Sequence, residues 1–104
     1  MTSTRSDDAD ALALSPRDNV ATALRAIEAG ERIVVHCHGS PSEITALDAI
    51  PFGHKICLRA LAANDTVRKY GEAIGHSVEP IATGRHVHVH NMRSNRAQQG
   101  RRTC

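Results

Sequence analysis

The chain has 104 residues, the length of a single domain, and 40% of them are hydrophobic whereas only 2% are aromatic. The core must therefore be aliphatic and thin, which favours association with a larger protein or with another copy of the chain. The formal net charge is +2, but four of the 13 basic residues lie after Met92. The rest of the chain therefore has nine basic and 11 acidic residues. This mildly acidic body, poor in aromatic residues, excludes the basic, aromatic-lined face of a nucleic-acid-binding protein.

The three cysteines are an odd number and include no CxxC pair, so they give neither a disulfide framework nor a zinc-knuckle pattern. We therefore expect a reducing compartment. The first residues lack the apolar run of a signal peptide, and no run is long enough to span a bilayer. The sequence thus predicts a soluble, cytoplasmic protein without membrane contact.

Composition divides the chain into a flexible N-terminal segment (1–15), a folded domain (16–92) and a disordered, arginine-rich tail (93–104). Early in the domain, apolar residues recur at steps of three and four, at Val20, Ala23, Leu24 and Ile27. This spacing predicts one short amphipathic helix. Asp18 or Asn19 would cap its start, and Gly30 would follow its end.

Short β-rich runs separated by Gly, Pro and Asn come next. The expected strands and extended pieces are 32–37, 43–47, 54–61, 67–70 and 73–81, with a final strand at 85–91. Many short strands punctuated by turn residues predict a mainly β fold with one short helix in a single compact domain.

The last of these runs carries histidines at every second position, His86, His88 and His90, with valines between them. On a strand, this spacing puts all three imidazoles on one face and the valines on the other. Such a face suits a metal ion, acid/base chemistry or contact with an anion. A solvated strand face without any function has the same pattern.

Geometry disfavours a metal site made by these three histidines alone. Side chains two positions apart on a strand are separated by roughly 6.5–7 Å, which is wider than the ligands of one metal ion. One or two of them, joined by groups from elsewhere in the chain, would make a better site. His36 and His38 also alternate, but they flank an apolar run at a turn, and we expect them to be structural or exposed.

Several motifs occur in an order that resembles one protein family. They are Asp18–Leu24, Ile50–Lys55, Leu58–Arg59, Val67–Gly75 and Ile81–Asn91. Together they make residues 16–92 similar to the SAF-type domain of the altronate dehydratase and galactarate dehydratase family. The resemblance implies a SAF-like β-clip fold.

The resemblance also implies a role. The chain would be the small subunit, or the detached N-terminal domain, of a lyase that dehydrates a sugar acid, most closely an altronate dehydratase. A larger catalytic subunit would hold most of the active site, including a divalent metal centre of iron or manganese, and the chain would not be active alone. Related branches of the family dehydrate galactarate or cleave sulfolactate to release sulfite.

Two positions depart from the family pattern. Asn64 stands where a glycine usually makes a turn, and asparagine tolerates the left-handed conformation that such a turn needs. His76 stands where an arginine is common. A contact made by that arginine in relatives would become pH-dependent here.

Loss of water from a hydroxy acid requires removal of a proton next to the carboxylate and help for the departing hydroxide. We expect His88 and His90 to be the catalytic residues, through proton transfer or a bond to a metal ion. The expected substrate-binding residues are His54, Lys55, Lys69, Tyr70 and Asn91. The lysines would supply positive charge to the carboxylate and Tyr70 a hydroxyl group.

These residues also have structural interpretations. Lys55 and Lys69 are typical of solvated lysines that cover apolar surface, and Tyr70 is typical of a core aromatic whose hydroxyl bonds to the backbone. Two other functions also fit the sequence. The chain would then be a stand-alone module that binds a sugar acid or a metal, or an oligomeric scaffold without chemistry.

Overall fold

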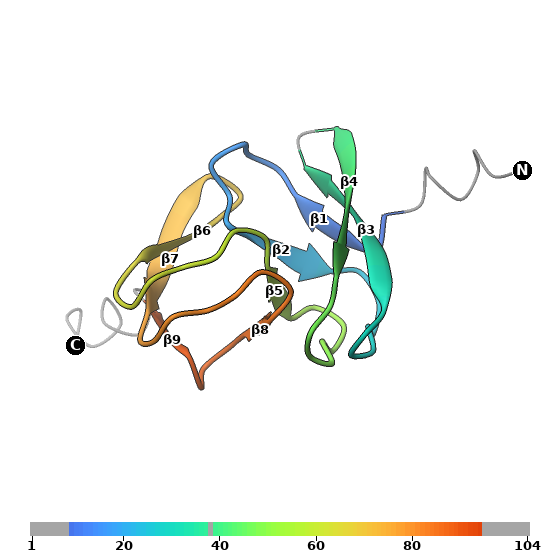
Figure 1. Ribbon diagram of the computed structural model, residues 1–104. Coiled ribbons are helices and arrows are strands. Elements are labelled where there is room, and N and C mark those ends of the chain that lie inside the picture. Colours follow the sequence, from blue (N-terminus) through green and yellow to red (C-terminus); the bar gives the residue numbers. More distant parts are fainter. Residues whose placement is uncertain (1–8, 38, 95–104) are drawn as a thin grey trace, which may run out of the picture.

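A computed structural model of the chain describes residues 9–37 and 39–94, which form nine β-strands and no helix (Figure 1). The strands are β1 (Ala11–Ala13), β2 (Val20–Ala23), β3 (Arg32–Cys37), β4 (Ser40–Thr45), β5 (Lys55–Cys57), β6 (Thr66–Lys69), β7 (Glu72–Ser77), β8 (His86–Val87) and β9 (Met92–Ser94). The mainly β, single-domain fold is confirmed. The described residues include no helix long and apolar enough to cross a membrane.

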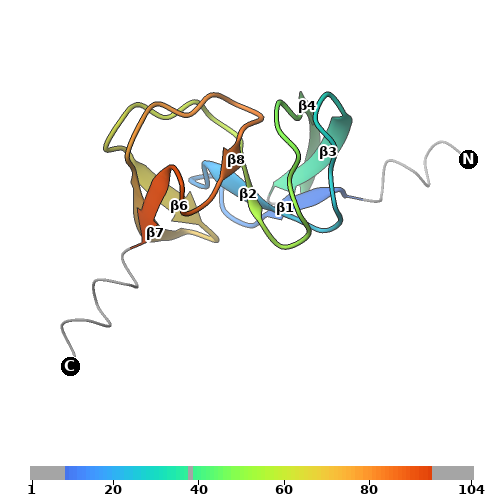
Figure 2. The same ribbon diagram turned by 90° about the horizontal axis from the view of Figure 1, so that it is seen from below.

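The strands form two sheets, which Figures 1 and 2 show next to each other. Six strands pair in the order β4-β3-β1-β2-β5-β8, and three pair in the order β6-β7-β9. β1 runs parallel to β3, whereas the other pairs of strands are antiparallel. β8 is therefore the edge strand of the larger sheet, and its side chains can reach the surface.

The predicted helix at 20–27 is wrong, because this segment begins with β2. Val20 and Ala21 are both fully buried, and they belong to two different hydrophobic clusters. A strand buried on both faces is apolar at consecutive positions and loses the alternation that identifies a strand. The apolar residue at the end of the segment, Ile27, instead makes an isolated bridge with Ile50.

The ordered domain also begins before residue 16. β1 lies inside the segment that was expected to be flexible, and it pairs in parallel with β3. Ala11 and Ala13 are fully buried there. At the other end, β9 includes Arg93 and Ser94, while the rest of the predicted disordered tail lies outside the described residues.

Aliphatic side chains fill the core, as expected. One cluster lies on β1, β2, β3 and β5 and includes Ile33 and Ile56. The second joins β2, β5 and β8 to the smaller sheet and includes Val67 and Val87. Tyr70 is not a core aromatic, since it is 40% exposed. It has a φ of 56° in the β6–β7 turn, and Asn64 has a φ of 69°, so asparagine does adopt the left-handed conformation.

Asp18 ties the β1–β2 connection to the turn between β6 and β7. Its carboxylate is fully buried and accepts hydrogen bonds from the backbone N–H groups of Leu14 (3.0 Å), Ser15 (3.1 Å) and Gly71 (2.7 Å). Burial by itself raises the pKa of Asp18, but the hydrogen bonds from Gly71, Ser15, Leu14 and Tyr70 outweigh it and hold the pKa below its usual value.

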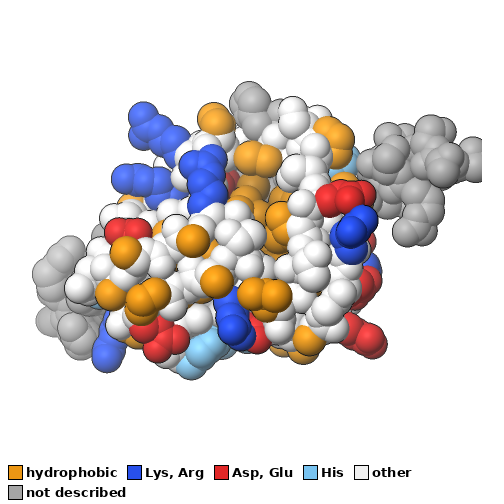
Figure 3. All heavy atoms as spheres, in the orientation of Figure 1, with side chains coloured by type: hydrophobic (Ala, Val, Ile, Leu, Met, Phe, Trp, Pro, Cys, Tyr) orange, Lys and Arg blue, Asp and Glu red, His pale blue; other side chains and the backbone are white. Residues whose placement is uncertain are grey.

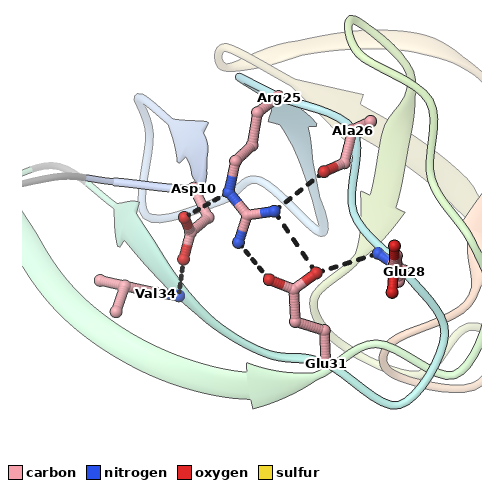
Figure 4. Close-up of polar contacts among 6 residues, drawn as sticks. All are labelled: Asp10, Arg25, Ala26, Glu28, Glu31 and Val34. Atoms are coloured by element: carbon pink, nitrogen blue, oxygen red, sulfur yellow. Dashed lines mark hydrogen bonds and ion pairs between the residues drawn. The ribbon is translucent and has the colours of Figure 1, made fainter.

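Arg25 links three parts of the larger sheet (Figure 4). Its guanidinium donates to the carboxylates of Asp10 and Glu31 and to the carbonyl of Ala26. Asp10 in turn accepts from the backbone N–H of Val34 at 2.8 Å. This network joins the start of β1, the segment after β2 and the middle of β3, which are neighbouring inner strands of the larger sheet.

Candidate histidine site

Four histidine rings from two separate segments meet at the edge of the larger sheet. The ring centroids of His54 and His88 lie 4.2 Å apart with an interplanar angle of 20°, and those of His54 and His86 lie 5.1 Å apart. His90 is tilted against His86 at 5.3 Å. The Nδ1 atom of His54 and the Nε2 atom of His86 are 2.9 Å apart and share a hydrogen bond. We call these four residues the histidine cluster.

The pairing of β5 with β8 explains why the rings meet. Lys55 pairs with Val87, and Ile56 with His86, in antiparallel register. Continuing this register by one residue puts His54 opposite His88, where side chains of neighbouring strands touch. His86 lies two residues from His88 on the same face and completes the group diagonally.

The predicted histidine strand is shorter than expected, and this change brings His90 into the cluster. β8 ends at Val87, which is fully buried, whereas Val89 is 80% exposed because it lies in a turn rather than on a strand. The turn folds the chain back before β9 begins at Met92. Side chains that would be spread along an extended strand therefore gather on one patch of surface. Figure 3 shows histidine side chains on the lower surface, where Figure 1 has the connection from β8 to β9.

Asn91 holds this turn together from inside. Its side chain is 4% exposed. Its Nδ2 group donates to the carbonyl of His86 at 2.8 Å, and its Oδ1 atom accepts from the backbone N–H of His88 at 2.9 Å. The backbone N–H of Asn91 donates to the carbonyl of His88 at 3.1 Å. The amide expected to bind substrate is thus engaged with the backbone and positions two of the histidines.

A second turn positions His54. Gly53 has a φ of 83°, a conformation that favours glycine, and its N–H donates to the carbonyl of Ala23 at 2.9 Å. The carbonyl of His54 accepts from the N–H of Ala23 at 2.8 Å. This turn is therefore fixed to the end of β2, deep in the larger sheet.

Two members of the cluster, His86 and His88, favour the neutral imidazole. Burial lowers the pKa of His86 below its ordinary value, and the charges of His54, His88 and His90 lower it further, against an opposing effect of Asp48. Burial also lowers the pKa of His88, together with the charges of His54, Lys55 and His90. Neutral imidazole is the form that accepts a proton or binds a metal ion.

Three members of the cluster also have the spacing of potential metal ligands. His54, His86 and His88 are all half-buried, and each offers one ring nitrogen such that the three nitrogens lie within 4.8 Å of one another. Zinc and similar ions need three or four such ligands at about 2.0–2.1 Å. These three histidines are the residues that could hold a metal ion at this site.

The predicted lysine and tyrosine residues form a second group beside the first. Side chains alternate along β5, so Lys55 points to the face opposite His54 and Ile56. Burial lowers the pKa of Lys55, and the charge of Lys69 lowers it further. The Lys69 ammonium lies 5.1 Å from the centre of the Tyr70 ring. The charge of Lys55 also lowers the pKa of His88, so the two groups act on each other electrostatically.

The two lysines bring positive charge to this region. Within the described residues, neither ammonium group makes an ion pair. Asp48 is an acidic residue that acts electrostatically on His86. Its carboxylate accepts hydrogen bonds from the backbone N–H of His86 and from the guanidinium of Arg85, each at 3.0 Å. A pocket lined by Asp48, Arg85, His90 and Glu79, among others, opens beside the cluster.

The structure thus brings His54, His88 and His90 together, as the sequence analysis expected, and adds His86, which had not been chosen as a site residue. The signal for His86 was present in its spacing from His88, but its contact with His54 depends on the β5–β8 register. Asp48 lies only six residues before His54, but its hydrogen bond to the backbone N–H of His86, 38 positions further along the chain, has no local sequence signal.

Comparison with known proteins gives the family to which this fold and site belong. The family model described as altronate/galactarate dehydratase SAF domain matches residues 9–95. The chain therefore belongs to the altronate/galactarate dehydratase SAF-domain family, and its fold is the SAF-type β-clip.

Relatives with a curated name fall into two groups. The chain is 46% identical over 79 residues to the altronate dehydratase of Bacillus subtilis (strain 168), covering 76% of this chain but 15% of that protein. It is 32% identical over 77 residues to the galactarate dehydratase (L-threo-forming) of Escherichia coli (strain K12), covering 74% of this chain and 12% of that protein. The chain thus spans a small part of the length of these dehydratases.

The second group consists of separate subunits. The chain is 48% identical over 63 residues to the (2R)-sulfolactate sulfo-lyase subunit alpha of Paracoccus pantotrophus, covering 61% of this chain and 94% of that subunit. A SAF domain of this family thus matches a small part of some lyases and nearly the whole of a lyase subunit.

Proposed function

We propose that this chain is the small subunit of a lyase acting on a hydroxy acid, with a sugar acid such as altronate as the substrate, and that it completes the substrate site of a larger catalytic subunit. The observation that carries the proposal is the half-buried Lys55 ammonium, which acts electrostatically on Lys69 and His88 and has no acidic partner among residues 9–37 and 39–94. A bound carboxylate would neutralise this charge and raise the lowered pKa of Lys55.

The chemistry of water loss fits the two adjoining groups. Lys55 and Lys69 bind the carboxylate, and Tyr70 offers its exposed hydroxyl beside them. The cationic groups stabilise the enolate charge that develops when the proton next to the carboxylate is removed. His90 is the exposed ring of the cluster and exchanges protons with the substrate, and His88 takes part through proton transfer or through a bond to a metal ion.

The surface around the cluster suits coverage by a larger subunit. Phe52 is 70% exposed and lies two residues before His54, and Val89 is 80% exposed between His88 and His90. Two exposed apolar side chains that flank a polar site are typical of a surface covered in a complex. The larger subunit would hold most of the active site, with its iron or manganese centre.

The test is co-expression with a large-subunit protein of the same family from the same genome. Copurification is measured first, and then formation of the 2-keto-3-deoxy product from altronate and of sulfite from sulfolactate, by each subunit alone and by the pair. We expect activity only in the pair. A large subunit that is equally active alone, or that forms no complex, would overturn the proposal, and ligand binding by the isolated chain would then favour a stand-alone binding module.

Matched variants connect the assay to the site. Lys55→Met should raise KM by tenfold or more, because it removes a cation that binds the substrate carboxylate. A tenfold change corresponds to about 1.4 kcal/mol of binding free energy. Arg32→Met removes a cation from β3, where Arg32 pairs with Glu43 at 3.8 Å on the exposed surface, and should leave KM unchanged. Equal effects of the two substitutions would show that Lys55 acts only through net charge.

A further inference from the structure

We propose that His54, His86 and His88 bind a divalent transition-metal ion in this chain itself, with one or more coordination positions left open. The site is additional to any metal centre of the larger subunit, and it does not depend on the proposed function, since the three ligands all come from this chain.

The three ring nitrogens are already close enough to converge. They lie within 4.8 Å of one another, and the Nδ1 of His54 and the Nε2 of His86 are separated by 2.9 Å. Ligands about 2.0–2.1 Å from a tetrahedral metal ion are roughly 3.3 Å from each other. The required adjustment is therefore of the order of 1–2 Å, which side-chain rotation can supply without a change in the backbone.

Rotation of the rings is a specific requirement of this site. A metal ion bound by an imidazole nitrogen lies in the plane of that ring, whereas the rings of His54, His86 and His88 are stacked within 23° of parallel. Binding must turn the rings out of this stack, and it replaces the hydrogen bond between His54 and His86 with two bonds to the metal. The aromatic environment of all three rings therefore changes when the ion binds.

The backbone under the ligands is held from both sides. The turn that carries His54 is bonded to Ala23 in β2, and His86 donates its N–H to Asp48. Asn91 fixes the backbone at both His86 and His88. Because the backbone is fixed in this way, metal binding requires rotation of the three side chains but no ordering of the chain beneath them.

The donor set selects the class of metal. Three imidazole ligands suit zinc, cobalt, nickel, copper or iron(II), whereas magnesium, calcium and manganese prefer oxygen ligands. The carboxylate of Asp48 already accepts hydrogen bonds from the backbone N–H of His86 and from Arg85, so it adds no oxygen ligand to the three imidazoles. Three protein ligands leave an open position, as in catalytic zinc sites, and His90 lies beside it as a proton acceptor or as a fourth ligand.

The test uses the full chain without an affinity tag, stripped of metal and titrated with Co²⁺ at pH 7.5. We expect visible d–d bands typical of four- or five-coordinate cobalt, bleached by competing Zn²⁺. His54→Ala and His88→Ala should each weaken binding by about 100-fold. His76→Ala, which removes a half-buried histidine from β7 in the smaller sheet, is the matched control and should leave the affinity unchanged.

Binding weaker than about 1 mM, or equal losses in His76→Ala and His88→Ala, would overturn the proposal. Because a variant can fail to fold, imidazole nitrogen NMR of the unmodified chain is the second measurement. Zn²⁺ should shift the signals of His54, His86 and His88 and should leave His36 and His76 in place. Shifts at other histidines alone would also overturn it. No partner subunit is present in either experiment, so a failure here leaves the proposed lyase role standing, and the reverse also holds.

Discussion

Truncation of Asn91 should cost stability and also disperse the histidine cluster. Asn91→Ala removes two hydrogen bonds between the buried side chain and the backbone of His86 and His88. Each such bond contributes about 0.5–1.5 kcal/mol, and a buried group left without a partner costs about 1–3 kcal/mol. We expect a loss of about 2–3 kcal/mol in the free energy of unfolding, measured by urea denaturation, and a fall in Tm of roughly 10–20 °C.

Asn19 offers a matched control for this prediction. Its side chain also bridges two backbone groups, donating to the carbonyl of Thr66 at 2.8 Å and accepting from the N–H of Arg68 at 2.7 Å. Asn19→Ala should therefore lose a similar or slightly smaller free energy, because Asn19 is less buried. The imidazole NMR signals of His86 and His88 should shift in Asn91→Ala and stay in place in Asn19→Ala. A loss below about 0.5 kcal/mol, or unchanged imidazole signals in Asn91→Ala, would refute the positioning role of Asn91.

Three further outcomes follow from the geometry. Asp18→Asn should lower the free energy of unfolding at pH 7 by about 1.5–3 kcal/mol, because a charged hydrogen-bond acceptor is lost. The folded pKa of Asp18 lies below its unfolded pKa, so this contribution should fade as the pH drops through the folded pKa. An effect on stability that is equal at pH 7 and pH 2 in urea titrations would contradict this. Gly75→Ala should destabilise the β7–β9 pair by about 1–3 kcal/mol, because a Cβ there would lie 2.1 Å from the carbonyl oxygen of Arg93. A variant whose Tm in differential scanning calorimetry equals that of the wild type would refute this steric clash. In the metal-free chain, the pKa values of His86 and His88 are lower in the folded state than in the unfolded state, so the unfolded state binds protons at a higher pH. The free energy of unfolding should therefore decline as the pH falls below 6.5. A double variant, His86→Ala with His88→Ala, should show a shallower decline in urea titrations between pH 7 and pH 5.

The amino-acid sequence by itself determined the class of fold and most members of the site. Short β-branched runs separated by Gly, Pro and Asn predicted a mainly β domain, since these local preferences do not depend on distant contacts. The motifs around His54 and His88 indicated two segments whose imidazoles meet in the structure. The left-handed conformation at Asn64 also followed from the residue type.

The tertiary structure decided which residues act together. The spacing of Val20, Ala23, Leu24 and Ile27 predicted a helix, and consecutive apolar residues such as Val20 and Ala21 do not show the alternation of a strand. Only packing against two clusters makes that segment β2. The end of β8 at Val87 could not be read from alternating histidines, since it depends on the buried amide of Asn91.

The site itself depends on a register that has no local signal. His54 and His88 are 34 positions apart in the sequence, and they touch because Lys55 pairs with Val87 in the antiparallel ladder. A shift of that register by one residue would send the imidazoles to the opposite face and abolish the cluster. Residue types and local spacing therefore determined what chemistry the chain can offer, while strand pairing, which follows from burial across the whole domain, decided that four imidazoles share one place.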